Sequence, residues 1–240
     1  MLAVIIPALN EEETIVSVIR STAEQLKRLN IQEFQVLVAD NGSSDATAHL
    51  AQEAGATVIE AETRGYGSAC LAGLAKNPYP DGIVCFLDAD GADDPRDFEA
   101  LLAPILAGDM DMVVGSRILG EHQGWVSPGA LTPVQSWGNR LSGFLLSRTW
   151  GVSFTDLGPF RAITAKALQS LEMDDKNWGW TIQMQARAAR KGLRVCEIPV
   201  HYRVRQGGQS KISGTLKGSI AAGVVILKTY AQSIFWCPNP

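Results

Sequence analysis

The sequence predicts an α/β protein whose central sheet is mostly parallel and carries helices on both faces. Two observations support this fold class. Short, unbroken apolar runs alternate with amphipathic segments through the first half of the chain. Such runs are typical of strands that are buried on both faces, as in parallel sheets. Several runs end in a turn with carboxylates, which places polar groups at the carboxyl edge of the sheet, where open α/β folds bind ligands.

The amino terminus predicts one strand followed by one helix. Residues 2–6 form the first apolar run, and Pro7 ends it because proline cannot donate a backbone hydrogen bond. Apolar positions then recur with helical spacing from residue 15 to residue 26. Asn10 is the expected cap of this helix, and the glutamates at 11–13 suit the positive end of its dipole.

The next unit repeats this order. We expect a buried strand over residues 34–39 and a helix over residues 46–54. Ser44 or Asp45 is the expected N-cap of the helix. Asp40 stands at the carboxyl end of the strand, which makes it the better candidate for a ligand.

A glycine-rich segment opens the third helix. After a short strand over residues 57–60, residues 64–69 read RGYGSA and lead into a small-residue helix that ends near residue 75. The glycines suggest a dinucleotide-binding loop, but Cys70 occupies the place of the third glycine, which weakens that interpretation. The free N–H groups of such a helix start can still bind an anion.

The central feature is an apolar run over residues 83–87 that ends in Asp88 and Asp90. Two carboxylates at the end of a buried strand repel each other, and removing them from water is costly without a cation. Oxygen ligands favour Mg²⁺ or Mn²⁺, and Mg²⁺ is usually held by one or two carboxylates together with substrate phosphates. The pair therefore predicts a metal–diphosphate site, with an Asp-rich structural turn as the alternative.

The next elements continue the alternation and then lose it. Asp93 or Asp94, followed by proline, is the expected cap of a helix near residues 98–106. A strand over residues 112–115 leads to Arg117 at the same sheet edge. The glycines and prolines that follow predict a long irregular loop, in which Trp125, together with Trp137 beyond it, could line an acceptor groove. The remaining elements are helices over residues 135–150, 165–171 and 181–191, a short strand after residue 160, and a strand over 193–202.

The carboxyl-terminal part combines a basic loop with an amphipathic tail. Arg205, Ser210 and Lys211 lie among glycines, which suits a loop that folds over phosphates; a solvated basic loop is the alternative. The charge-free stretch in residues 212–240 is shorter than a membrane span requires. Lys217 and Lys228 lie three helical turns apart and share a face, so this helix packs on the domain or lies in a membrane interface.

Composition limits the classes of function. The chain has 240 residues, a formal net charge of −4 and a pI near 5.4, which argues against nucleic acid as the main partner. Its four cysteines are scattered without metal-ligand spacing, and the first residues lack the pattern of a signal peptide. A reduced cytoplasmic location, peripheral at the cytoplasmic face of the membrane if the tail binds lipid, is the expectation.

Several motifs stand in one order along the chain. They are PALNEE at Pro7, DNGSSD at Asp40, RGYGSA at Arg64, DADG at Asp88, GSR at Gly115, TDLGPFRAI at Thr155 and RQGGQSK at Arg205. Together they resemble family 2 glycosyltransferases, which have the GT-A fold with a Rossmann-like sheet. The branch that looks most similar contains the dolichyl-phosphate mannosyltransferases and the bacterial polyprenyl-phosphate glycosyltransferases.

The resemblance implies a division of labour. Residues 1–211 would form the catalytic domain, with a nucleotide-sugar half at 1–117 and an acceptor half at 118–211, and residues 212–240 the amphipathic tail. Asp88 and Asp90 would hold Mg²⁺ or Mn²⁺. The resemblance places the donor nucleotide against Pro7, Ala8, Asn10, Glu11, Asp40, Gly67, Asp88, Ala89, Asp90, Arg205, Ser210 and Lys211. It places the acceptor against Arg117, with Gln135 and Arg140 as further candidates. The candidate catalytic residues are Arg117 and Asp156.

Two positions depart from the dolichyl-phosphate branch. Ala92 stands where those enzymes have a glutamine that completes the metal shell, so Asp93 or water would take its place. A second acceptor-side arginine has no clear counterpart, and Arg140 is the nearest candidate.

The resemblance implies a metal-dependent, inverting transfer of a sugar from GDP-mannose or a UDP-sugar to a lipid-linked acceptor such as polyprenyl phosphate. A hydroxyl acceptor would need a base, for which Asp156 is the candidate, although a structural turn explains that residue equally well. A sugar nucleotidyltransferase and a non-catalytic sugar-nucleotide-binding module are the other readings. The first usually begins with a glycine-rich basic loop, whereas this chain is acidic there. The sequence is compatible with both a monomer and a homo-oligomer.

Overall fold

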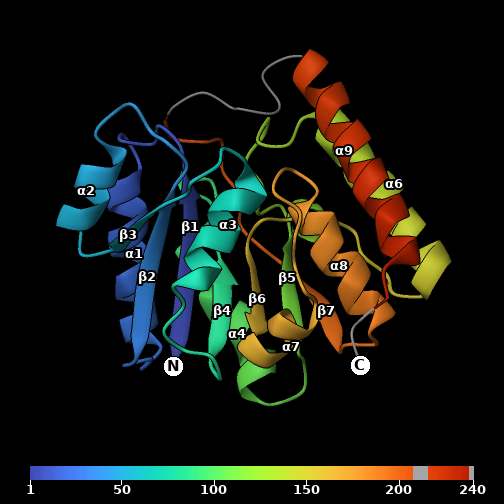
Figure 1. Ribbon diagram of the computed structural model, residues 1–240, viewed down its shortest axis with the longest axis horizontal. Coiled ribbons are helices and arrows are strands. Elements are labelled where there is room, and N and C mark those ends of the chain that lie inside the picture. The colour runs from blue at the N-terminus through green and yellow to red at the C-terminus, as the bar shows by residue number, and fades with distance from the viewer. Residues whose placement is uncertain (208–215, 238–240) are drawn as a thin grey trace.

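The computed structural model of the chain describes residues 1–207 and 216–237; of residues 216–222 the helix is described, without the side chains. One sheet of seven strands organises the described part of the chain, in the order β3-β2-β1-β4-β6-β5-β7 (Figure 1). The strands are β1 (Leu2–Ala8), β2 (Phe34–Asp40), β3 (Thr57–Glu60), β4 (Ile83–Phe86), β5 (Met112–Ser116), β6 (Arg161–Thr164) and β7 (Val195–Pro199).

The expectation of a mostly parallel sheet is confirmed. Pairs β1–β2, β1–β4, β2–β3 and β5–β7 are parallel. Strand β6 runs antiparallel to both of its neighbours, β4 and β5. It therefore joins the strands β3, β2, β1 and β4 to the pair β5 and β7 in one sheet.

Helices cover both faces of this sheet. They are α1 (Ile15–Arg28), α2 (Thr47–Glu53), α3 (Tyr66–Ala75), α4 (Phe98–Leu106), α5 (Arg117–His122), α6 (Pro133–Trp150), α7 (Ala165–Ser170), α8 (Trp180–Arg190) and α9 (Leu216–Phe235). Because side chains alternate along a strand, β1 feeds two cores. Val4 and Ile6 pack with α1 and α4, while Ala3 and Ile5 pack with α3, α7 and α8.

Four local expectations are wrong. Ala46 rather than Ser44 or Asp45 precedes α2, and Asp45 Oδ1 accepts a hydrogen bond from Thr47 N (3.0 Å). Strand β1 continues through Pro7 to Ala8, because β4 pairs with β1 only as far as Ile5 and no ladder bond on that side needs the missing N–H. Thr14 rather than Asn10 precedes the first turn of α1, and no acidic side chain lies in that turn. The segment after β5, predicted as a loop, begins with helix α5. Ser116 caps this helix, and its hydroxyl accepts a hydrogen bond from Leu119 N (3.1 Å).

Helix α9 packs on the domain. Its Tyr230 lies against the end of α6, within 2.5 Å of the Thr149 hydroxyl and edge-on to Trp150. The guanidinium of Arg187 in α8 covers the ring of Trp236, just beyond α9, at 4.7 Å. Figure 1 shows α6 and α9 side by side at one end of the molecule. Among the described residues, no helix is long and apolar enough to cross a membrane.

Candidate active site

The carboxyl ends of four strands open onto one cavity of about 670 Å³. Residues just beyond β1, β2, β4 and β5 line it, as expected for the ligand edge of an α/β sheet. The predicted site residues on its wall are Pro7, Ala8, Glu11, Asp88, Ala89, Asp90, Arg117, Gln135 and Arg205.

The acidic pair after β4 lines this cavity, and one oxygen of each carboxylate accepts a hydrogen bond from the protein. Asp88 Oδ1 accepts a hydrogen bond from the Tyr66 hydroxyl (3.1 Å), and Asp90 Oδ1 accepts one from Ala92 N (3.0 Å). Burial, followed by repulsion from Asp90, raises the pKa of Asp88 to about 7. An acid in this environment binds a proton or a cation more readily than an exposed one.

A strap from the carboxyl-terminal part runs along the acidic loop. Arg203 N donates to Ala92 O (2.8 Å), and Gln206 N donates to Asp90 O (3.0 Å). Between them, Arg205 forms an ion pair with Glu11, and its Nε lies 3.8 Å from Asp90 Oδ2. The basic segment therefore meets the acidic pair although they lie more than a hundred residues apart. Ser210 and Lys211 fall outside the described residues.

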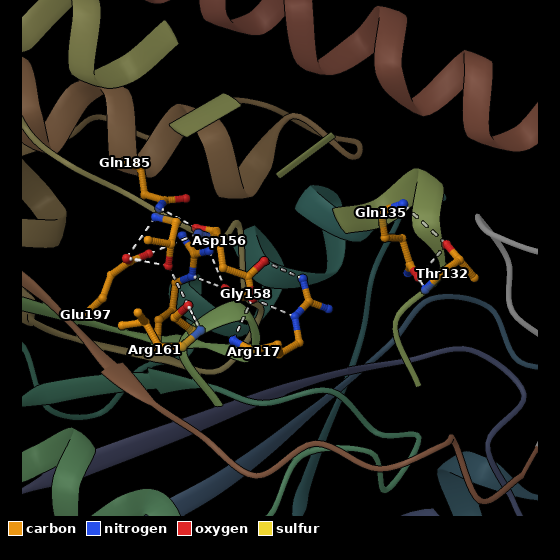
Figure 2. A network of polar contacts seen from close by, with 11 residues as sticks. Arg117, Thr132, Gln135, Asp156, Gly158, Arg161, Gln185 and Glu197 are labelled. Atoms are coloured by element: carbon orange, nitrogen blue, oxygen red, sulfur yellow. Dashed lines mark hydrogen bonds and ion pairs between the residues drawn. The ribbon is translucent and has the colours of Figure 1, made fainter. Parts of the chain in front are cut away.

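Arg117 and Asp156 form a buried pair beneath the cavity (Figure 2). Asp156 Oδ2 accepts from Arg117 N (2.8 Å) and Nε (2.7 Å), and Oδ1 accepts from Nη2 (2.8 Å). The backbone N–H of Asp156 donates to Glu197 Oε1 (3.1 Å), and the backbone carbonyl of Asp156 accepts from Gln185 Nε2 (2.9 Å). Asp156 is 1% exposed and does not line the cavity, so its carboxylate serves the arginine. This geometry favours the structural interpretation of Asp156 over the role of base.

Three predicted donor residues are used for loop structure and do not line the cavity. Asn10 Oδ1 accepts from Ser44 N (2.8 Å). Asp40 accepts from the N–H of Ser43 (3.1 Å) and from its hydroxyl. Gly67 N donates to Asn177 O (3.2 Å), so this helix start does not offer a free N–H to an anion there. A Cβ at Gly67 would lie 2.0 Å from the carbonyl oxygen of Asp175, which explains the glycine by close packing.

Helix α6 presents neutral amides to the cavity instead of an arginine. Gln135 and Asn139 line the wall, one helical turn apart, whereas Arg140 is exposed and lies off the wall. Gln135 Oε1 accepts from Thr132 N (2.9 Å) in a capping box at the start of α6 (Figure 2). Asn139 Nδ2 is buried without a hydrogen-bond partner in the described part of the chain.

Sequence reasoning missed the inward-facing residues Tyr66, Asn139, Trp178 and Tyr202. The four-residue spacing of Gln135 and Asn139 is a signal that could have revealed the second amide. The predicted groove tryptophans lie elsewhere: Trp125 stacks on His201 (4.5 Å), and Trp137 is 67% exposed.

The acidic pair suits a cation that is shared with a ligand. Within residues 1–207 and 216–237, no three His, Cys, Asp or Glu side chains converge on one metal position. Asp93 therefore does not complete a protein-only shell; it is buried, and both of its oxygens lack hydrogen-bond partners in this part of the chain. Two carboxylates with open oxygens fit Mg²⁺ or Mn²⁺, since such sites are commonly completed by substrate phosphates and water.

The fold has clear structural relatives. The chain superposes over 100% of its length on 81% of glucosyl-3-phosphoglycerate synthase from Mycobacterium tuberculosis, with a TM-score of 0.76 and 24% identity. That protein was crystallised with Mn²⁺, UDP-glucose and phosphoglyceric acid. This likeness shows that the chain has the GT-A fold.

Sequence comparison gives the family. Residues 3–171 match the model of glycosyl transferase family 2. An uncharacterized glycosyltransferase of Mycobacterium tuberculosis is 37% identical over 91% of this chain and 93% of its own length. The undecaprenyl-phosphate mannosyltransferase of Micrococcus luteus is 30% identical over 92% of this chain and 90% of its own length. The chain belongs to glycosyltransferase family 2, as its motifs predict.

Proposed function

We propose that this glycosyltransferase moves a sugar from a nucleoside-diphosphate sugar to a polyprenyl phosphate, with inversion at the anomeric carbon. The observation that carries the proposal is the meeting of Asp88 and Asp90 with Arg205 at one cavity wall. Charges of both signs suit a diphosphate that arrives with its cation. The relative that acts on undecaprenyl phosphate supports the acceptor class, and the Mn²⁺–UDP-glucose complex of the structural relative supports the donor class.

The donor half would work through charge. Asp88 and Asp90 would hold Mg²⁺ or Mn²⁺, and this cation neutralises charge on the leaving diphosphate when it is bound. Arg205 adds a positive charge at the same place, and Pro7, Ala8 and Glu11 shape the wall on which the nucleotide would lie. GDP-mannose and UDP-sugars both fit this description.

The transfer itself needs little proton chemistry. An acceptor oxygen bonds to the anomeric carbon while the bond from that carbon to the diphosphate oxygen breaks, and the nucleoside diphosphate leaves with the electron pair. A phosphate oxygen is already anionic and has no proton to lose. A hydroxyl acceptor would need a base, but Asp156 is buried and bound to Arg117. The pairing of Asp156 therefore supports a phosphate acceptor over a hydroxyl.

The acceptor half would combine Arg117 with the amides of α6. Asp156 binds Nε and Nη2 of Arg117, so Nη1 is the nitrogen that this pair does not use. Gln135 and Asn139 face the same cavity and would donate hydrogen bonds to acceptor oxygens. In this arrangement the two amides do the work that the predicted Arg140 was expected to do.

A lipid-linked acceptor implies a membrane-facing side, which we assign to α6 and α9. Their outer side chains include several exposed apolar residues: Val134, Trp137, Phe144, Val224, Leu227 and Phe235. Neither helix contains an acidic residue, and Arg140, Arg148, Lys217 and Lys228 are basic, in a chain with a formal net charge of −4. Ile226 of α9 also lines the cavity, so this surface adjoins the site. Apolar and basic groups together suit an anionic membrane interface.

A donor screen followed by a transfer assay tests the proposal. The melting temperature is measured with UDP-, GDP- and dTDP-sugars, with and without Mn²⁺, and the stabilising donor is offered with a polyprenyl phosphate in detergent. We expect metal-dependent stabilisation and transfer, and a loss of at least ~100-fold for Asp88→Ala, since metal ligands and their charge support the leaving group. Glu99→Ala, an exposed carboxylate in α4, is the control. Full transfer by Asp88→Ala would refute the proposal.

A further inference from the structure

Tyr66 makes a side-chain contact with the acidic pair that the proposed chemistry has not used. Its hydroxyl donates to Asp88 Oδ1 at 3.1 Å, and its ring lines the cavity. Asp90 has the corresponding arrangement through the backbone, since its Oδ1 accepts from Ala92 N. Each carboxylate thus has one oxygen fixed by a hydrogen bond, while Oδ2 of Asp90 faces Arg205 Nε at 3.8 Å.

The backbone that carries Tyr66 is fixed on both sides. A Cβ at Gly65 would lie 2.0 Å from Lys176 O, and one at Gly67 would lie 2.0 Å from Asp175 O. Gly67 N donates to Asn177 O (3.2 Å), and Ser68 N donates to Lys176 O (3.0 Å). The loop 175–177 therefore packs closely against the start of α3 and fixes the backbone position of Tyr66.

The loop 175–177 is itself held in place by hydrogen bonds. Asp175 accepts hydrogen bonds from Asn177 N (2.8 Å) and from the Thr229 hydroxyl of α9 (3.0 Å). Ser68 also turns its hydroxyl toward Lys176 O (3.2 Å). With its backbone held this way, Tyr66 reaches Asp88 from a rigid support, and the hydrogen bond restricts the rotation of the carboxylate.

We infer that Tyr66 is a positioning residue that orients Asp88 for the divalent cation and thereby sets the affinity of the metal site. The inference rests on the proposed function, because it concerns the cation which that function requires. A partner that orients a metal ligand typically changes metal affinity or activity 10–100-fold. If Tyr66 only satisfied its own hydroxyl, removing that oxygen would leave cation binding unchanged.

Direct measurement of Mn²⁺ binding tests this role without relying on turnover. Free Mn²⁺ is counted by electron paramagnetic resonance as it is titrated onto the full chain in the presence of UDP, and in parallel GDP. We expect Tyr66→Phe, which keeps the ring and removes only the hydroxyl, to bind Mn²⁺ ~10-fold more weakly. Tyr79→Phe is the matched control, because Tyr79 packs in the same core but does not line the cavity.

The outcomes separate the two proposals. An unchanged melting temperature of Tyr66→Phe in EDTA, together with weaker Mn²⁺ binding, supports a role in positioning the ligand. Mn²⁺ affinity within about twofold of the wild type, below the range expected for such a partner, overturns the inference and leaves the proposed function intact. Absence of Mn²⁺ binding by the wild-type chain with either nucleotide overturns both.

Discussion

Arg117 shows how one residue can have two predicted roles that only its contacts separate. Its guanidinium lies over the ring of Tyr202 (5.1 Å) and is held by Asp156 on its other edge. Breaking a buried pair of this kind leaves an uncompensated charge, which commonly costs ~3–5 kcal/mol. The arginine is therefore part of the fold beneath the cavity as well as of its wall.

The acidity of Asp88 predicts a pH dependence of cation binding. Burial and Asp90 raise its pKa to about 7 from the usual value of 3.8. In the metal-free protein, folding stabilises the protonated form of Asp88 relative to its carboxylate. The contribution of Asp88 to the free energy of unfolding is therefore full below pH ~4 and is lost as the pH rises through about 7. A cation reverses this trend because it stabilises the carboxylate.

We therefore expect the rise in melting temperature caused by Mn²⁺ to be larger at pH ~7.5 than at pH ~5.5. Thermal unfolding with Mn²⁺ or EDTA at both pH values measures it. Asp88→Asn, which cannot ionise, should lose most of the difference. An equal Mn²⁺ effect at both pH values in the wild type would contradict the assignment.

At the scale of elements, the close contact between the start of α3 and the loop 175–177 requires glycine at residues 65 and 67. A side chain at Gly67 would separate these segments and break the hydrogen bonds that the helix start makes with the loop. Overpacking of this kind typically costs ~1–3 kcal/mol.

We expect Gly67→Ala to lower the free energy of unfolding by ~1–3 kcal/mol without any ligand, as measured by urea denaturation. The control is Gly138→Ala in α6, where a Cβ meets nothing within 4 Å. Alanine should raise stability there by ~0.5–1 kcal/mol, because it favours a helix more than glycine does. A Gly67→Ala protein of normal stability that failed only to bind the donor would return this residue to the nucleotide site.

At the scale of the molecule, the paired helices α6 and α9 contain basic and no acidic residues, although the chain as a whole has a formal net charge of −4. The basic, partly apolar surface of this pair adjoins the cavity, while the excess of acidic residues lies elsewhere in the chain. An acceptor that enters from a bilayer would reach Gln135 and Asn139 from this side.

This arrangement predicts binding to anionic lipid vesicles that depends on the exposed aromatic residues. We expect the double substitution Trp137→Glu and Phe144→Glu to weaken co-sedimentation with phosphatidylglycerol-containing vesicles at least ~10-fold, since each buried aromatic side chain contributes ~1.5–3 kcal/mol. Leu106→Glu, which alters another exposed apolar side chain at the end of α4, should have little effect. Equal loss in both variants would show that charge alone, and no particular surface, controls binding.

Apart from helix α5, the sequence by itself determined the order of strands and helices along the chain and the place of the acidic pair. Apolar runs and carboxylates that end them are local features, and the direction of a parallel strand fixes the edge at which its last residues lie. Helix α4, the strand β3 and the position of Asp88 and Asp90 just beyond β4 therefore agree with expectation, while Asp94 caps the short 3-10 turn Pro95–Asp97 that precedes α4.

Only the tertiary structure decided which polar side chains face the cavity. Asn10, Asp40, Gly67 and Asp156 stand in motifs, yet neighbouring loops use their donors and acceptors. Tyr66, which lies in the RGYGSA motif without an assigned role, and Asn139, which lies in no motif, line the cavity. The physical reason is that a buried polar group must find its partner among residues distant in sequence, and packing alone brings those residues together.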